Sequence, residues 1–327
     1  MLAFAGLFCQ YVASRHAAWL LYFSAFFVSM LALNVIYSSM VGLVPDLVSE
    51  EETGKANGIA AMLGVMGAVS GFGVYHIFND VESMYLYYML LLAATIGITS
   101  ATAKEASQEG KVYAAVGFDD VRNAFFVSPV EHRDFFWVFI SRTLYYMGIS
   151  SQTFFLYYLK DVIHVDDPQA ATSVMAVIGP CCGAISALPM GFISDTLQNG
   201  RKIYIYVSCA VMAAGNVALI GATTVKTVYC LSGLIGFANG AYLTMDNSLA
   251  VDTLPSKAEA ARWMGIWGVG AFIGTAMGPM IGGPVLFYIG HTDTYGEYSI
   301  DGYAVLLSLS AVYFCASSFV LKYISAK

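Results

Sequence analysis

The chain has 327 residues, of which 58% are hydrophobic and only 11% are charged. A soluble protein of this length cannot bury so large an apolar fraction, so the composition excludes a soluble globular protein and indicates a surface that faces lipid. The formal net charge of −7 says little about partners, because membrane orientation follows the placement of Lys and Arg rather than total charge.

Ten apolar segments follow one another along the chain, and nearly all reach the roughly 20 residues that a helix needs to cross a bilayer. The alternation of apolar and polar residues expected of outer-membrane strands is absent, so the segments predict helices. The predicted fold class is an all-α polytopic membrane protein with about ten transmembrane helices. The segments are Leu2–Ala13, Ala17–Pro45, Gly58–Phe78, Met84–Ala103, Phe135–Tyr158, Ala171–Ile193, Ile203–Thr223, Val228–Leu249, Trp263–Ile289 and Tyr303–Tyr323.

The first segment is too short to cross a bilayer, and an internal repeat suggests why. The stretch Asn34–Gly73 recurs as Asn239–Gly283, about 206 residues later, with matched Asn, Tyr, Met, Asp, basic and Gly positions. A repeat of several membrane helices at half-chain spacing is typical of secondary transporters. We therefore expect a twelve-helix design that lacks its first two helices, through a truncated gene model or a real short form.

The repeat divides the chain into three parts. Residues 1–103 are predicted to form an incomplete N-terminal bundle, equivalent to helices 3–6, and residues 135–327 a six-helix C-terminal bundle. Residues 104–134 form a central loop in which Asp119–Phe126 has one apolar and one charged face, which favours a short surface helix over a plain linker. Strict alternation of the helices places most Lys and Arg on the side of this loop, so the loop and the C-terminus are expected to be cytoplasmic.

Clusters that carry enzyme chemistry are absent from the sequence. The six cysteines all fall in apolar segments without ligand spacing and are interpreted as small packing residues, and the five histidines are scattered among loops and helix ends. We find no nucleophile–base set, phosphate loop or metal-ligand spacing. We therefore expect no enzymatic activity and no cofactor, and the expected partners are the bilayer and a small solute rather than nucleic acid.

Two ionisable residues stand out well inside predicted spans, where each costs about 2.5–3.5 kcal/mol on insertion scales and is therefore a functional candidate. Arg142 and Asp246 lie at similar depth, so they can pair if their helices are neighbours. The alternative is that Arg142 extends to the headgroups and Asp246 merely neutralises it. Other polar residues, at spacings of three and four, share the helical face of each charge and form a polar stripe with it. The candidate solute and ion path comprises Arg142, Tyr145, Gln152, Asn239, Tyr242 and Asp246 with Asn34 and Tyr37 of the first half.

The loop from Gly191 to Lys202 resembles the signature of the major facilitator superfamily, which reads Gly, three residues, Asp, a base, one residue, Gly and two bases. The matching residues are Gly191, Asp195, Gly200, Arg201 and Lys202. Thr196 replaces the first base, and four residues rather than two separate Asp195 from Gly200. In that family the loop forms a cytoplasmic latch with an acid at the inner end of the fourth or tenth helix, and Asp46 and Asp252 occupy those positions. The alternative is that both bases are plain positive-inside anchors.

Two further resemblances point to branches of the superfamily. Gly274–Gly283 is similar to a signature of its proton antiporters, but it falls on the eleventh helix rather than the fifth, so close packing with a kink at Pro279 is preferred. The stretch Phe136–Lys160 resembles the seventh helix of its sugar and cation symporters, where Tyr145, Tyr146 and Gln152 would stack on and bond to a sugar. The alternative is that these aromatic residues lie at a membrane interface.

The resemblance as a whole implies an integral multi-pass transporter that moves a small solute by alternating access. It implies coupling to a proton or cation, with Asp246 as the coupling carboxylate and a sugar as one candidate solute. A second class stays open, namely a non-transporting membrane sensor or scaffold, or an inactive fragment. Without the first helix, a quarter of the wall of the family's central cavity would be missing.

Overall fold

The computed structural model describes residues 2–16, 18–49, 52–78, 80–102, 127–196, 200–256, 259–292 and 296–325. Over these residues the chain is helical apart from turns and one antiparallel bridge between His291 and Tyr298. Seven of the described helices are long and apolar enough to cross a membrane. The all-α polytopic fold is confirmed, and the chain is an integral membrane protein with several spans.

The helices form two groups along the chain. The first group contains α1 (Leu2–Arg15), α2 (Trp19–Leu47), α3 (Thr53–Ile77) and α4 (Val81–Thr102). The second group contains α6 (Arg133–Ile149), η2 (Ser150–Phe154), α7 (Phe155–Asp161), α8 (Pro168–Thr196), α9 (Arg201–Ile220), α10 (Val225–Asp252), α11 (Ala260–Ile289), α12 (Ile300–Val320) and η4 (Leu321–Tyr323). The predicted surface helix at Asp119–Phe126 lies outside the described residues.

Polar side chains fix the starts of several helices by accepting from free backbone N–H groups. The Asp80 carboxylate accepts from the Ser83 N–H at 2.7 Å before α4, and Asp167 accepts from Ala170 at 2.9 Å before α8. The Thr224 hydroxyl accepts from the Thr227 N–H at 3.3 Å before α10. The side-chain and backbone hydrogen bonds of Ser83 hold the pKa of Asp80 below its usual range.

The predicted span Phe135–Tyr158 is interrupted rather than continuous. After Ile149 the chain tightens into the 3₁₀ turn of η2 and resumes as α7. The Ser150 hydroxyl donates to the Met147 carbonyl at 2.7 Å, and the Ser151 hydroxyl donates to the Gly148 carbonyl at 2.9 Å. Because such local bonds compete with the helical ladder, two adjacent serines account for the break.

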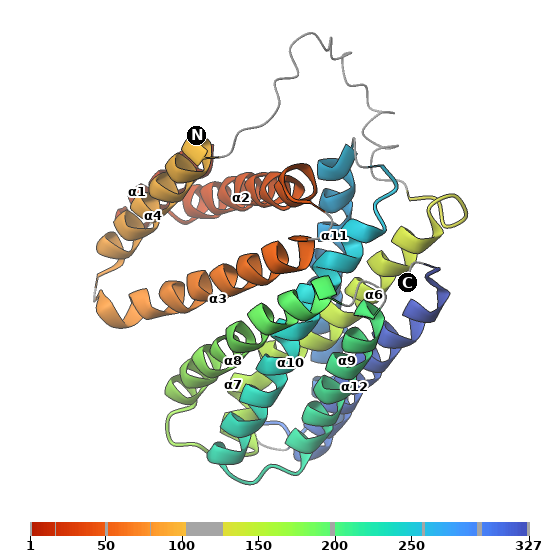
Figure 1. The fold of residues 1–327 in the computed structure, drawn as a ribbon. Helices are drawn as coiled ribbons and strands as arrows, with labels where there is room; N and C mark the ends of the chain where they lie inside the picture. The colour runs from red at the N-terminus through yellow and green to blue at the C-terminus, as the bar shows by residue number, and fades with distance from the viewer. Residues whose placement is uncertain are drawn as a thin grey trace.

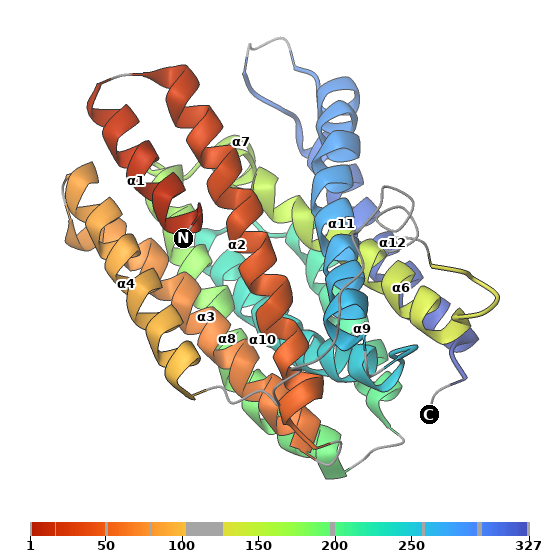
Figure 2. The same ribbon diagram turned by 90° about the horizontal axis from the view of Figure 1, so that it is seen from above.

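The two helix groups meet at one end and spread apart at the other (Figures 1 and 2). Between the groups α3 packs against α8, and α2 packs against α11. Helices α3 and α8 approach closely at Gly58 of α3, where an added Cβ would lie 2.9 Å from the Ala187 carbonyl oxygen. At Gly64 and Gly67, farther along α3, an added Cβ would have no neighbour within 4 Å. We refer to the meeting point, formed by Thr53–Gly58, Ala187–Gly191 and Ser248, as the closed end.

Glycines also let α8 and α10 cross closely within the second group. A Cβ at Gly183 would lie 3.0 Å from the Gly236 carbonyl oxygen, and one at Gly240 would lie 2.5 Å from the Ser186 hydroxyl oxygen. The Ser186 hydroxyl donates to the Phe237 carbonyl at 2.6 Å. Lipid gives no hydrophobic drive for helix association, so this close contact and its hydrogen bond are what hold the pair together.

Gly240→Ala is therefore expected to destabilise the protein by about 1–3 kcal/mol, because the new methyl group overlaps the α8 backbone. Gly268→Ala in α11 is the matched control, since an added Cβ there has no neighbour within 4 Å. Alanine's higher helix propensity should leave this control neutral or up to about 1 kcal/mol more stable. Thermal unfolding of both purified variants in detergent compares them, and equal midpoints would contradict close packing at Gly240.

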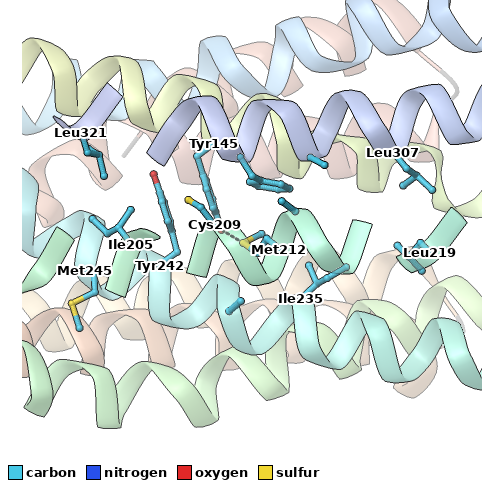
Figure 3. Packing of buried hydrophobic residues seen from close by; sticks show 14 of the residues in the cluster. Tyr145, Ile205, Cys209, Met212, Leu219, Ile235, Tyr242, Met245, Leu307 and Leu321 are labelled. Atoms are coloured by element: carbon cyan, nitrogen blue, oxygen red, sulfur yellow. Dashed lines mark hydrogen bonds between the residues drawn. The ribbon is translucent and has the colours of Figure 1, made fainter. Parts of the chain in front are cut away.

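The buried apolar core lies in the second group (Figure 3). Its largest fully buried side chains include Trp267, Tyr145 and Tyr242. All six cysteines are free, but only Cys209 is buried in this core, while Cys181, Cys230 and Cys315 are exposed. The interpretation of the cysteines as packing residues therefore fits Cys209 and does not fit those three.

Candidate functional site

An ion pair lies inside the second helix group, between α6 and α10. An Arg142 Nη1 N–H donates to the Asp246 carboxylate, and both side chains are only 2% exposed. Arg142 is nine residues into α6 and Asp246 six residues from the end of α10. The structure thus brings together the two intramembrane charges of the sequence, and each neutralises the other in a region where an unpaired charge is costly.

Aromatic rings enclose the Arg142 guanidinium on two sides. Its Cζ lies 3.3 Å from the centroid of the Trp267 ring and 4.8 Å from that of Tyr146. Its Nη2 also donates to the Tyr146 hydroxyl at 3.4 Å. Contact between a cation and aromatic faces contributes about 2 kcal/mol when desolvated, so the rings help to hold the charge where it is.

A second polar contact lies one helical turn from Arg142 along α6 and two turns from Asp246 along α10. The rings of Tyr145 and Tyr242 are parallel, with centroids 3.4 Å apart, and Figure 3 shows them side by side. The Tyr145 hydroxyl donates to the Asn239 side-chain oxygen and lies 3.3 Å from the Met212 sulfur. The predicted stripes Arg142–Tyr145 and Asn239–Tyr242–Asp246 therefore face each other.

Of the other residues of the predicted path, Gln152 and Asn34 are not part of this cluster, and Tyr37 borders it. Gln152 falls in the 3₁₀ turn and is exposed, because the break after Ile149 removes it from the face shared by Arg142 and Tyr145. Asn34 is exposed on α2 and donates to the Met30 carbonyl at 2.8 Å. Tyr37, which is 53% exposed on α2, is near enough to Arg142 to interact with it electrostatically.

Two buried donors beside the ion pair have no hydrogen-bond partner among the described residues. They are the Nε of Arg142 and the indole nitrogen of Trp267. The Tyr242 hydroxyl interacts with the Asp246 carboxylate. Buried polar groups are almost always hydrogen-bonded, and unpaired ones in native structures call for an ordered water, an ion or a functional role.

The residues predicted for a latch lie at the closed end. Arg201, the first residue of α9, donates to the Asp252 carboxylate and to the Ser248 carbonyl at 3.3 Å, and is 2% exposed. Lys202 donates to the Ile324 carbonyl at 2.6 Å. Both bases begin α9, and their side chains reach carbonyl groups at or just beyond the C-terminal ends of α10 and η4, where positive charge is favourable. The side chains of Asp46 and Asp195 lie outside the described residues.

The contact between the two helix groups at this end involves Gly191 of the predicted latch and two residues outside it, Asn57 and Ser248. The Asn57 amide of α3 donates to the Ser248 hydroxyl at 3.2 Å, and a Cβ at Gly191 would lie 2.6 Å from the Gly54 carbonyl oxygen. The Arg201–Asp252 pair joins α9 to α10 within one group, and Ser248 links that pair to α3. Gly200 is the N-cap residue of α9.

The Gly274–Gly283 segment packs against the predicted span Phe135–Tyr158. A Cβ at Gly274 would lie 2.7 Å from the Tyr146 Cβ, and one at Gly278 would lie 2.8 Å from the Ser150 Cβ. Helix α11 runs continuously through Pro279. The geometry supports the packing interpretation of this segment.

Sequence reasoning did not identify Trp267, Asn57 or Ser248. Trp267 follows Trp263 by one helical turn in an apolar helix, and that spacing is the signal that could have marked a ring facing inward. Asn57 and Ser248 are common polar residues near helix ends, and nothing in the sequence distinguishes them from solvated neighbours.

Comparison with known proteins matches residues 138–325 to the family described as Major Facilitator Superfamily. MFS transporter L2 of Phoma sp. (strain ATCC 20986 / MF5453) is 31% identical over 84 residues, which are 26% of this chain and 14% of that relative's length. The chain therefore matches only a small part of this relative.

Two solved structures show the same fold. The human organic anion transporter MFSD10 (TETRAN) gives a TM-score of 0.78 at 14% identity, over 98% of this chain and 75% of that chain. FucP, a transporter crystallised in the outward conformation, gives a TM-score of 0.73 at 12% identity, over 100% of this chain and 81% of that chain. At identities this low, the likeness to these two structures concerns the fold alone.

Proposed function

Because the chain belongs to the Major Facilitator Superfamily, we propose that it is a secondary active transporter that moves a small polar solute by alternating access, coupled to a proton or cation. The observation that carries the proposal is the Arg142–Asp246 pair, buried inside membrane helices with unpartnered donors around it. Ionisable residues in such positions mark substrate and ion paths. Asp246 is the coupling carboxylate.

The arrangement of the two helix groups supports alternating access. They are in contact at the closed end through Asn57 and Ser248 and spread apart at the other end. Lys55, Arg201 and Lys202 lie toward the closed end, which would be cytoplasmic by the positive-inside rule. The chain is then in an outward-facing state, with its C-terminus cytoplasmic.

One structural neighbour supports coupling to a proton and a sugar as one class of solute. FucP of E. coli is a fucose:proton symporter. Two related bundles, residues 1–103 and 135–327, with a central loop at 104–134 would provide the two bodies that rock against each other.

Asp246→Asn is expected to abolish gradient-driven accumulation, because the amide cannot gain or lose the coupled proton. Uptake of a panel of radiolabelled sugars and organic acids into proteoliposomes, with and without an inward proton gradient, measures the effect. Asp301→Asn, the same substitution at an exposed position in the first turn of α12, is the control and should retain wild-type uptake. Full gradient-driven uptake by Asp246→Asn would reject the proposal.

A further inference from the structure

The chemistry of the unpartnered groups around Arg142 indicates what occupies the site. Arg142 Nε and Trp267 Nε1 are both donors, and each is buried without a partner in the described part of the chain. The charge beside them is a guanidinium that contacts its carboxylate through one nitrogen, Nη1. A ligand that fits this excess of hydrogen-bond donors presents acceptor atoms. A negatively charged ligand suits the site best, since charge-assisted hydrogen bonds are about twice as strong as neutral ones.

Asp246 decides when such a ligand can bind. While Asp246 is ionised, it neutralises Arg142 and repels an incoming anion. Protonation of Asp246 removes that repulsion and leaves Arg142 without a counter-charge. An anion then restores neutrality in a buried site, where an uncompensated charge is strongly unfavourable. One proton and one monovalent anion together leave the total charge of the site unchanged.

We infer that the Arg142–Asp246 pair is a single site for an organic monoanion and a proton, with the anion on Arg142 and the proton on Asp246. This inference rests on the proposed function for its role in transport, and it narrows the solute from a small polar molecule to a carboxylate or sulfonate. Aromatic walls at Trp267 and Tyr146 favour an anion with an apolar body.

The surroundings of Asp246 leave it as the group that takes up the proton. No ionisable side chain of α3, α8 or α11 is among its main electrostatic partners in the described residues. Tyrosine hydroxyls and a thiol are uncharged at neutral pH and below, and Arg142 keeps its proton. The titratable or charged groups that face the pair are Arg142, Tyr145 and Tyr146 of α6, Tyr242 of α10, Cys209 of α9 and Tyr37 of α2.

The inference is tested by equilibrium dialysis of the purified full chain in detergent with three radiolabelled probes. Benzenesulfonate stays ionised at every pH used, benzoate is its carboxylate counterpart, and benzamide is the uncharged control. Both anions should bind at pH 5.5, and benzamide should bind at least about tenfold more weakly, a difference of about 1.4 kcal/mol. Affinity for benzenesulfonate should fall by about tenfold per pH unit once Asp246 ionises, because one proton is taken up with each anion.

Two substitutions assign the roles. Asp246→Asn should bind benzenesulfonate with an affinity that no longer depends on pH, since the amide mimics the protonated acid. Arg142→Gln should lose binding of both anions at every pH. If Asp246→Asn does not fold, the slope of wild-type benzenesulfonate binding between pH 5.5 and 8.5 decides the matter.

Three results would each overturn the inference: no binding of either anion at pH 5.5, equal affinity for benzamide, or a benzenesulfonate affinity independent of pH in the wild type. Because dialysis needs no gradient, anion binding without gradient-driven uptake would leave the anion site standing and reject the transport proposal. Gradient-driven uptake of a neutral sugar without anion binding would reject the anion site and leave the transport proposal standing.

Discussion

Asp246→Asn is expected to destabilise the folded protein by about 3–5 kcal/mol, because it leaves the buried Arg142 guanidinium without its counter-charge. Arg142→Gln should be less severe, since the carboxylate left behind can take up a proton whereas a guanidinium cannot lose one. The asymmetry should widen at low pH, where Asp246 is protonated in the Arg142→Gln variant. Thermal and denaturant unfolding of each variant in detergent micelles measures these losses.

The double variant Arg142→Gln with Asp246→Asn separates a true pair from two independent sites. It should be more stable than Asp246→Asn alone, because the unpaired charge is gone and two amide side chains can bond to each other. The exposed pair Glu259–Arg262, at 2.8 Å with side chains 51% and 35% exposed, is the matched control. Breaking it should cost no more than about 1 kcal/mol. Additive losses at residues 142 and 246 would show that the two charges do not interact.

The helices and the ion pair could be predicted from the sequence because both depend on the preference of single segments for lipid. An apolar run of about 20 residues has few alternatives to a spanning helix, and a charge inside such a run requires a partner at matching depth. Arg142 and Asp246 were two charges at similar depth within predicted spans, so the cost of leaving either unpaired predicted their pairing, provided that their helices are neighbours.

The features that could not be predicted depend on which helices are neighbours and how they are rotated. The hydroxyls of Ser150 and Ser151 account for the break after Ile149. Serine hydroxyls in other helices bond to a carbonyl without interrupting the backbone hydrogen bonds, as Ser29 does in α2. The pairing of Arg201 with Asp252 was expected from the resemblance, and both residues fall in the predicted C-terminal bundle, but no sequence signal indicated that Ser248 would link this pair to α3. The bond from Asn57 to Ser248 spans 191 residues and arises from packing.

Gly58→Leu is expected to open the closed end, because its side chain enters the crossing of α3 and α8. A Cβ at Gly58 would already lie 2.9 Å from the Ala187 carbonyl oxygen and 3.3 Å from the Gly191 Cα, so both helices must move apart. Overpacking costs about 1–3 kcal/mol in this closed state alone. The ratio of open to closed protein should therefore rise by about 5- to 150-fold, and outward-facing solute binding should weaken accordingly.

Labelling of a cysteine at Ser248 by a membrane-impermeant maleimide measures the opening, in a background whose six native cysteines are replaced by alanine. Ser248 is fully buried in the closed end and accepts from Asn57 of the opposite group, so Ser248→Cys should react slowly until the groups separate. Gly64→Leu, on the same helix at a position with no neighbour within 4 Å, is the matched control and should leave the rate unchanged. Equal labelling rates in Gly58→Leu and Gly64→Leu would mean that the α3–α8 crossing does not hold the two helix groups together, because only Gly58 lies in it.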